Sequence, residues 1–165
     1  MLASNSVRDN EELWMRMQRG AWRTLAIIPA SALDSAASFA FARLLVRCGQ
    51  SFGQAVELAD LRQIRMAQVG ALLEVVDWRL QTGPRVILST LSPEENPASV
   101  AFGRAADAAA LCVTVGATSL TKARVAVSRV GRERFVGTIS LAAHKGPDTQ
   151  RGLLQLAPRP DELAP

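Results

Sequence analysis

The sequence predicts an α/β protein with three layers, in which a mostly parallel sheet of five to six strands carries helices on both faces. Two observations support this fold class. The segments that resemble strands are continuous apolar runs instead of alternating apolar and polar residues, which is typical of strands buried on both faces. These runs also alternate along the chain with longer segments of helical periodicity, as in proteins built from β-α-β units.

The strands are expected where short apolar runs lie between turn residues. Five of them are predicted, at residues 23–30, 55–59, 85–91, 110–117 and 134–142. A further short edge strand is predicted within the segment "LLQLA".

The helices are expected where apolar residues recur at helical spacing, with capping and stop signals at their ends. They are predicted at residues 9–19, 35–48, 64–80, 97–106 and 119–130. Asn96 followed by Pro97 is a helix start, because proline at the first helical position lacks only an N–H that would be unpaired anyway. Thr118 or Ser119 is expected to cap the last helix, and Gly49 and Gly131 are expected to stop the helices before them.

At 165 residues the chain is long enough for one domain with one core. We predict a helical segment at residues 1–20, a single α/β domain at residues 21–145, and a tail at residues 146–165 that holds four of the eight prolines. No uncharged apolar run reaches the roughly 18 residues that span a membrane. The first residues lack the basic start and apolar stretch of a secretory signal, so we expect a cytoplasmic protein without an integral membrane segment.

The polar composition excludes several kinds of site. Cys48 and Cys112 lie in apolar segments and are expected to be buried, unpaired thiols. His144 is the single histidine, so a histidine-rich metal site or a Ser-His-Asp triad lacks its parts. The net charge is +4 and the pI about 10.0. The lysine and arginine residues are scattered along the sequence, which favours a solvated surface over a basic patch that binds nucleic acid.

The chain resembles the P-loop ATPases of the ParA/MinD (SIMIBI) type, and most closely the tyrosine-kinase (BY-kinase) domains of bacterial capsule and exopolysaccharide systems. The segment "RAADAAALCVTVGATSLTKAR" follows the family's "ADAVLLVVRAGRT" and the helix after it. In the first half, "RTLAIIPAS…FARLLVRCGQ…VELADLR" follows the family's first strand, phosphate loop, helix and "DADLR". The likeness covers residues 23–141, although about 25 to 30 family residues before the third strand are missing. It implies a shortened P-loop-type fold.

Carried over by this resemblance, the family's nucleotide-site residues are mostly replaced. The phosphate-loop lysine falls on Asp34 and the glycine before it on Leu33, while the magnesium-binding hydroxyl falls on Ser35 and the threonine after it on Ala36. The first aspartate of "DADLR" falls on Leu58, whereas its second aspartate and its arginine persist as Asp60 and Arg62. The aspartate of "IIDTPP" falls on Ser89. The asparagine that reads the nucleotide base falls near Ala142.

These replacements predict that the loop does not hold a nucleotide. A phosphate loop needs glycine-exposed N–H groups, a lysine, and magnesium held by hydroxyl and carboxylate groups. Asp34 puts a negative charge where the phosphates would lie. Ser31 and Asp34 also match the Ser-x-x-acid capping box, so the helix start is expected to satisfy its own N–H groups. We therefore expect no cofactor, no metal and no catalytic residue, and the lack of any tyrosine excludes tail autophosphorylation of the kind the kinases perform.

The favoured function is a catalytically inactive binding or regulatory subunit in exopolysaccharide biosynthesis and export. By the resemblance, its partner would be a membrane-embedded polysaccharide co-polymerase or export protein, or a second copy of the chain, which would make the protein peripheral at the inner membrane. The candidate interface lies in the N-terminal segment, at Glu12, Leu13, Trp14, Arg16 and Met17. In the alternative, the apolar members of this set pack against the domain's own sheet.

Two other functions stay open at this stage. The crevice at the carboxyl ends of the strands could bind or convert a small molecule, as in other open α/β sheets. Its candidate polar residues are Ser31, Ser35, Asp60, Arg62, Ser89, Thr90 and Glu94. The basic pI also fits a ParA-like positioning protein, which would bind DNA at low salt.

Overall fold

The sheet of the predicted α/β fold is present in the computed structural model, which describes residues 11–18, 20–142 and 155–157. The strand order is β2-β3-β1-β4-β5-β6, and the first five strands are parallel. Strand β6 pairs with β5 in the antiparallel sense. The strands are β1 Thr24–Pro29, β2 Val56–Asp60, β3 Arg85–Ser89, β4 Ala108–Thr114, β5 Phe135–Leu141 and β6 Gln155–Ala157. A mostly parallel, five- to six-stranded sheet is therefore confirmed.

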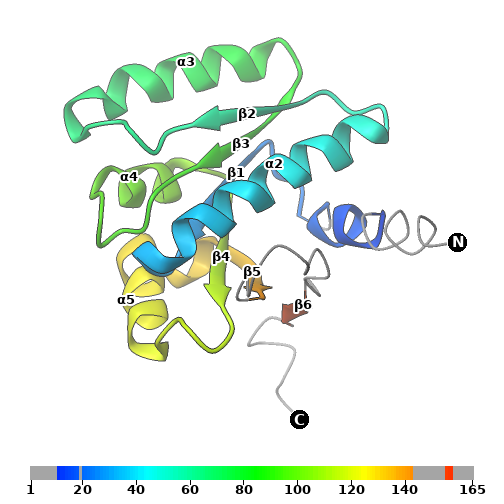
Figure 1. Cartoon of the computed structure of the whole chain (residues 1–165). Helices are drawn as coiled ribbons and strands as arrows, with labels where there is room; N and C mark the ends of the chain where they lie inside the picture. Colours follow the sequence, from blue (N-terminus) through cyan, green and yellow to red (C-terminus); the bar gives the residue numbers. More distant parts are fainter. Residues whose placement is uncertain (1–10, 19, 143–154, 158–165) are drawn as a thin grey trace, which may run out of the picture.

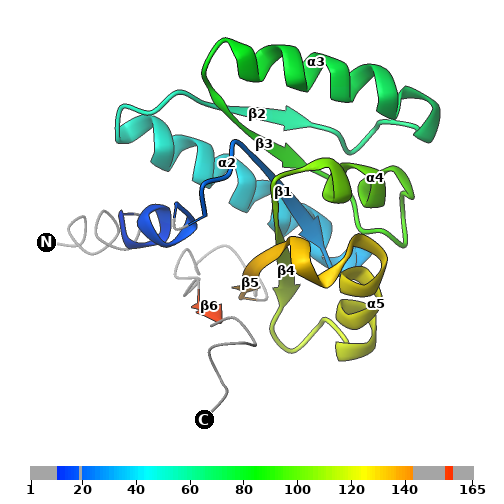
Figure 2. The same ribbon diagram turned by 180° about the vertical axis from the view of Figure 1, so that it is seen from behind.

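Helices cover both faces of this sheet. They are α2 Ser35–Ser51, α3 Val69–Gln81, α4 Ala98–Ala105 and α5 Leu120–Val130, with 3-10 turns η1 Ala32–Asp34, η2 Met66–Gln68 and η3 Arg132–Arg134. Helix α2 packs on one face (Figure 1), together with the helical residues 11–17. Helices α3, α4 and α5 pack on the other face (Figure 2). In the part of the chain that is described, no helix is long and apolar enough to cross a membrane.

The core forms because β1, β3 and β4 bury side chains on both faces. In β1, Leu25 and Ile27 pack under α2, whereas Ala26 and Ile28 pack under α3 and α4. All four side chains have no exposed surface. This burial explains the continuous apolar runs of the sequence, because strands covered on both faces need apolar residues at every position.

The predicted stop of the first long helix at Gly49 is wrong, since α2 continues to Ser51. Gly49 is buried inside the helix, at a position where there is no room for a side chain. A Cβ atom there would lie 2.5 Å from Val56 Cγ2 and 2.6 Å from Trp14 Cη2. The left-handed turn after the helix is made by Gly53, at φ +70°.

This packing predicts that Gly49→Ala destabilises the protein, although alanine is the better helix former. The intrinsic gain is about 1 kcal/mol, while overpacking a dense core costs about 1–3 kcal/mol. Gly70 in α3 is the matched control, because nothing lies within 4 Å of a Cβ added there. Gly70→Ala should raise the urea midpoint and Gly49→Ala should lower it; an equal increase for both would contradict the packing of Gly49.

Other element boundaries differ from prediction by a few residues. The helix predicted from residue 64 begins at Val69, after the 3-10 turn η2, and the strand predicted to reach residue 91 ends at Ser89. The strand predicted at 110–117 lies at Ala108–Thr114. The cap at Ser119 is confirmed, since its side chain accepts a hydrogen bond from the backbone N–H of Lys122. Helix α4 begins at Ala98, one residue after its predicted start at Pro97, and the Asn96 side chain accepts a hydrogen bond from the backbone N–H of Ala98. His144, and most of the tail, lie outside the described residues.

Candidate functional site

The candidate site is the loop between β1 and α2, at the carboxyl edge of the sheet. Strand β1 ends at Pro29, and the chain forms the 3-10 turn η1 before α2 begins at Ser35. In the described residues, only glycines have a positive φ, and this loop contains none. The loop therefore lacks the left-handed residue that an anion-binding nest of backbone N–H groups requires.

Asp34 is the residue around which the loop is organised. Its side chain is completely buried. Oxygen Oδ2 accepts hydrogen bonds from the backbone N–H of Ser31, at 2.9 Å, and from the Ser31 hydroxyl, at 2.8 Å. This is the capping-box arrangement that the spacing of Ser31 and Asp34 predicts. Leu33 lies between them with 71% of its surface exposed.

The other carboxylate oxygen of Asp34 reaches a strand far away in the sequence. Oδ1 accepts hydrogen bonds from the backbone N–H of Thr114, at 2.8 Å, and from the Thr118 hydroxyl, at 2.5 Å. Asp34 thus joins the loop after β1 to the end of β4. A buried carboxylate is costly unless donors surround it, and here four donors do so.

Thr114 and Thr118 are site residues that the sequence analysis missed. Thr114 is the last residue of β4, and its N–H is taken by Asp34 and by the Thr118 hydroxyl at 2.8 Å. These bonds and the left-handed Gly116, at φ +80°, end the strand three residues before its predicted end. Two hydroxyl residues four apart after an apolar strand are the only sequence signal for this contact.

Ser35, at the position of the magnesium-binding hydroxyl, is engaged by the loop that follows β3. Its hydroxyl donates to Glu95 Oε2 at 2.7 Å. The same oxygen accepts from the Ser92 hydroxyl at 2.8 Å. Partial burial of Glu95 acts to raise the pKa of its carboxyl, but the hydrogen bonds from Ser35 and Ser92 outweigh it and lower that pKa. Glu95 was not among the predicted site residues.

Asp60 and Arg62, the pair that persists from the family motif, are bound to each other. The Arg62 guanidinium donates from Nε to Asp60 Oδ1 at 2.8 Å and from Nη2 to Oδ2 at 2.7 Å. It also lies over the Phe39 ring, 3.5 Å from the centroid. The side-chain hydrogen bond with Arg62 lowers the pKa of Asp60, against a smaller opposing effect of burial.

The sheet places the remaining predicted residues without gathering them around one point. Ser89 pairs in register with Ile27 of β1 and Asp60 of β2. Its buried hydroxyl has no hydrogen-bond partner among the described residues. The Thr90 hydroxyl donates to the Ile27 carbonyl at 3.1 Å. Leu58 is half-buried against the α2 side of the core, where its side chain serves packing.

The predicted interface residues of the N-terminal segment divide into two groups. Leu13, Trp14 and Met17 are 6%, 2% and 2% exposed and pack into the core beneath α2. Their burial makes these three side chains unavailable to a partner in this structure. This agrees with the alternative in which the apolar members of the set pack against the domain's own sheet. Glu12 and Arg16 are exposed and form an ion pair with each other.

The described residues contain no cluster of three metal-ligating side chains. Cys48 and Cys112 are free and buried, and burial raises the pKa of the Cys112 thiol to about 12. Burial also raises the pKa of the Cys48 thiol, and in both residues it disfavours the thiolate, which is the reactive form.

Comparisons with known proteins identify solved structures that have a similar fold. No family model matches the chain, and no curated protein matches it. Among solved structures, the kinase domain of Escherichia coli tyrosine kinase ETK is similar, with a TM-score of 0.66 and 12% identity over 91% of this chain and 80% of that chain. The chimerical protein CapA2B2 is similar with a TM-score of 0.63 and 11% identity, over 84% of this chain and 82% of that one. The chain thus has the P-loop-NTPase-like α/β fold of these proteins.

Proposed function

We propose that this chain is a catalytically inactive protein with the fold of the bacterial tyrosine kinases, and that it acts as a binding or regulatory subunit in exopolysaccharide biosynthesis and export. The observation that carries the proposal is the placement of Asp34. Its buried carboxylate takes the hydrogen bonds of Ser31, Thr114 and Thr118 at the start of α2. In a P-loop protein, phosphate groups are bound at this end of the corresponding helix.

Electrostatics supports the same proposal. A carboxylate fixed in the loop repels the phosphates of a nucleotide, and the low local dielectric constant strengthens that repulsion. The hydroxyl of Ser35 is held by Glu95, and Arg62 is held by Asp60. A nucleotide would have to break these contacts and would find no lysine in the loop.

A nucleotide titration tests the inactive site. We expect no measurable heat when ATP and Mg²⁺ are titrated into the protein by calorimetry, and no change in melting temperature on adding both. Binding stabilises a fold by RT ln(1 + [L]/Kd), so a millimolar ligand with a micromolar Kd would add about 4 kcal/mol. A rise of several degrees with ATP, or release of phosphate from it, would overturn the proposal.

Co-purification tests the role as a subunit. We expect the chain to co-purify with a membrane-embedded co-polymerase or export protein encoded beside it, or to self-associate in light scattering. A protein that stays monomeric, and that such a neighbour does not retain on an affinity column, would contradict the role even if the nucleotide result held.

A further inference from the structure

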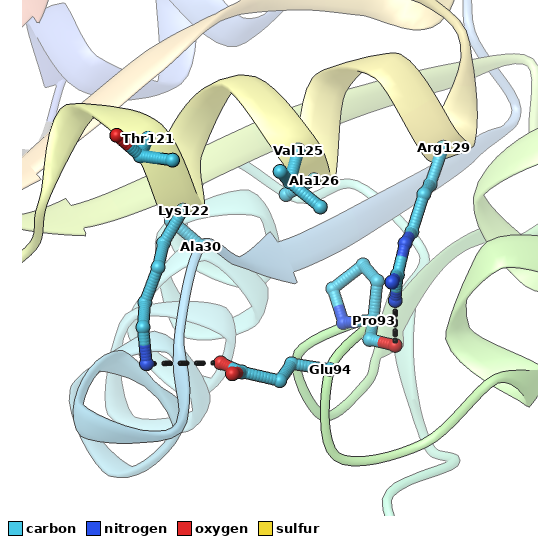
Figure 3. A pocket seen from close by; sticks show the side chains of 8 residues that line it. All are labelled: Ala30, Pro93, Glu94, Thr121, Lys122, Val125, Ala126 and Arg129. Carbon is cyan, nitrogen blue, oxygen red and sulfur yellow. Dashed lines mark hydrogen bonds and ion pairs between the residues drawn. The ribbon is translucent and has the colours of Figure 1, made fainter.

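A small cavity lies between α5 and the loop that leads into α4. Its volume is about 120 Å³, and Figure 3 shows the side chains around it: Ala30, Pro93, Glu94, Thr121, Lys122, Val125, Ala126 and Arg129. Its walls are apolar at Ala30, Pro93 and Val125. An apolar cavity of roughly 150 Å³ accommodates a benzene molecule, so this one has room for a single aliphatic side chain.

Two cations of α5 stand on either side of the cavity (Figure 3). Lys122 Nζ lies 3.0 Å from Glu94 Oε2. Arg129 Nη1 donates to the Pro93 carbonyl at 3.0 Å. The Arg129 guanidinium is thus positioned by a neutral backbone group, and no carboxylate balances its charge among the ion pairs of the described residues.

An excess of positively charged side chains also extends over the neighbouring surface. Helix α5 contains Lys122, Arg124 and Arg129 and no acidic residue. Arg104 of α4 donates to the Arg129 carbonyl at 2.7 Å, and Arg134 donates to the Ala106 carbonyl at 3.3 Å. Lys122 is the single cation of this group that has an ion pair within the described part of the chain.

Apolar side chains lie exposed on the same helix. Leu120 is 66% exposed and Val125 is 43% exposed, and Val125 lines the cavity. A basic helix with exposed aliphatic residues beside an apolar cavity combines an electrostatic attraction with a place for one buried contact. Protein interfaces combine a small apolar anchor with a charged rim in the same way.

We propose that the surface formed by α5, the C-terminal end of α4 and the cavity between α5 and the loop that leads into α4 binds an acidic protein segment, which inserts one aliphatic side chain into the cavity. The inference rests on the proposed role as a binding subunit and names the chemistry of the partner. Carboxylates of the segment would pair with Arg104 and Arg129, which form no ion pair among the described residues. The attraction between these opposite charges is expected mainly to speed association, while the buried aliphatic side chain of the segment slows its dissociation.

The shape of the surface favours a protein segment over a membrane or a nucleic acid. A lipid surface is broad and needs exposed apolar residues that enter it, whereas the apolar part here is a concave cavity for one side chain. Single-stranded nucleic acid is typically bound with stacking on aromatic rings, and no aromatic residue lines this cavity.

The test uses peptides selected from a random library on the intact protein. We expect the selected peptides to be rich in Asp and Glu around one aliphatic residue. The dissociation constant of a selected, fluorescently labelled peptide is then measured by anisotropy for the protein and three variants. Arg129→Glu removes a positive charge that lines the cavity, and Val125→Arg fills the mouth of the cavity while adding a positive charge. Arg47→Glu is the matched control, because Arg47 is exposed on α2 at the other face of the sheet.

Both surface variants are expected to weaken binding at least about 10-fold, and the control less than about 2-fold. Val125→Arg is the decisive variant, since attraction by charge alone would make it bind an acidic peptide more tightly. Unchanged or tighter binding by Val125→Arg overturns the inference, as do selected peptides without an acidic excess. Binding of anionic phosphatidylglycerol vesicles or duplex DNA that is lost in Arg129→Glu but kept in Val125→Arg also overturns it, in favour of a lipid or nucleic-acid surface. None of these results depends on ATP binding, so this inference and the inactive site fail separately.

Discussion

Asp34→Ala is expected to destabilise the protein by about 3 kcal/mol or more, because the substitution leaves a group of buried donors without an acceptor. The backbone N–H of Ser31 and the hydroxyls of Ser31 and Thr118 donate to this carboxylate, whereas the Thr114 N–H keeps its second bond to the Thr118 hydroxyl. An unsatisfied buried donor costs about 1–3 kcal/mol. The effect should also reach beyond the loop, since Asp34 joins it to the end of β4.

Urea denaturation of the variant and of two further proteins measures this effect. Asp34→Asn keeps the shape and one acceptor oxygen, but its amide group faces donors, so we expect a loss of at least about 1 kcal/mol. Asp77→Asn is the matched control, because Asp77 is exposed on α3 and the same charge is removed. Its effect should stay within about 0.5 kcal/mol. Equal midpoints for Asp34→Asn and Asp77→Asn would show that the buried carboxylate does not organise the loop.

The prediction of the fold from sequence succeeded where local pattern and burial agree. The continuous apolar run of β1 is buried on both faces, so its composition alone indicates its place in the sheet. The capping box of Ser31 and Asp34 could be predicted because its two members are three residues apart. The contacts of Asp34 with Thr114 and Thr118 could not, because they join positions 80 and 84 residues away in the sequence.

At Gly49 the prediction failed for a different reason, because packing against other elements overrode a local sequence signal. Glycine near the end of an apolar helix predicts a stop. Here the helix continues, and Trp14 and Val56 occupy the space a side chain would take. Both neighbours come from other elements, so the sequence of α2 itself carries no sign of them. Leu13, Trp14 and Met17 illustrate the same limit, since a short amphipathic helix exposes or buries its apolar side according to what lies beneath it.

Trp14→Ala is expected to destabilise the domain by about 3–5 kcal/mol, as large-to-small substitutions of buried aromatic residues do. Trp14 is among the largest fully buried side chains of the protein, and its ring meets that of Trp22 edge to face, with centroids 6.2 Å apart. The helical residues 11–17 would then belong to the core and would not be a detachable interface segment.

Met15→Ala separates these two roles, because Met15 is in the same helical turn and is 68% exposed. Its effect on stability should stay within about 0.5 kcal/mol. Unfolding midpoints and light scattering on both variants give the comparison. A stable Trp14→Ala variant whose only defect is weaker self-association or partner binding would place Trp14 at an interface. A lower midpoint with unchanged association would place it in the core, and a partner contact made by residues 11–17 would then use their exposed side chains, Glu11, Glu12, Met15 and Arg16.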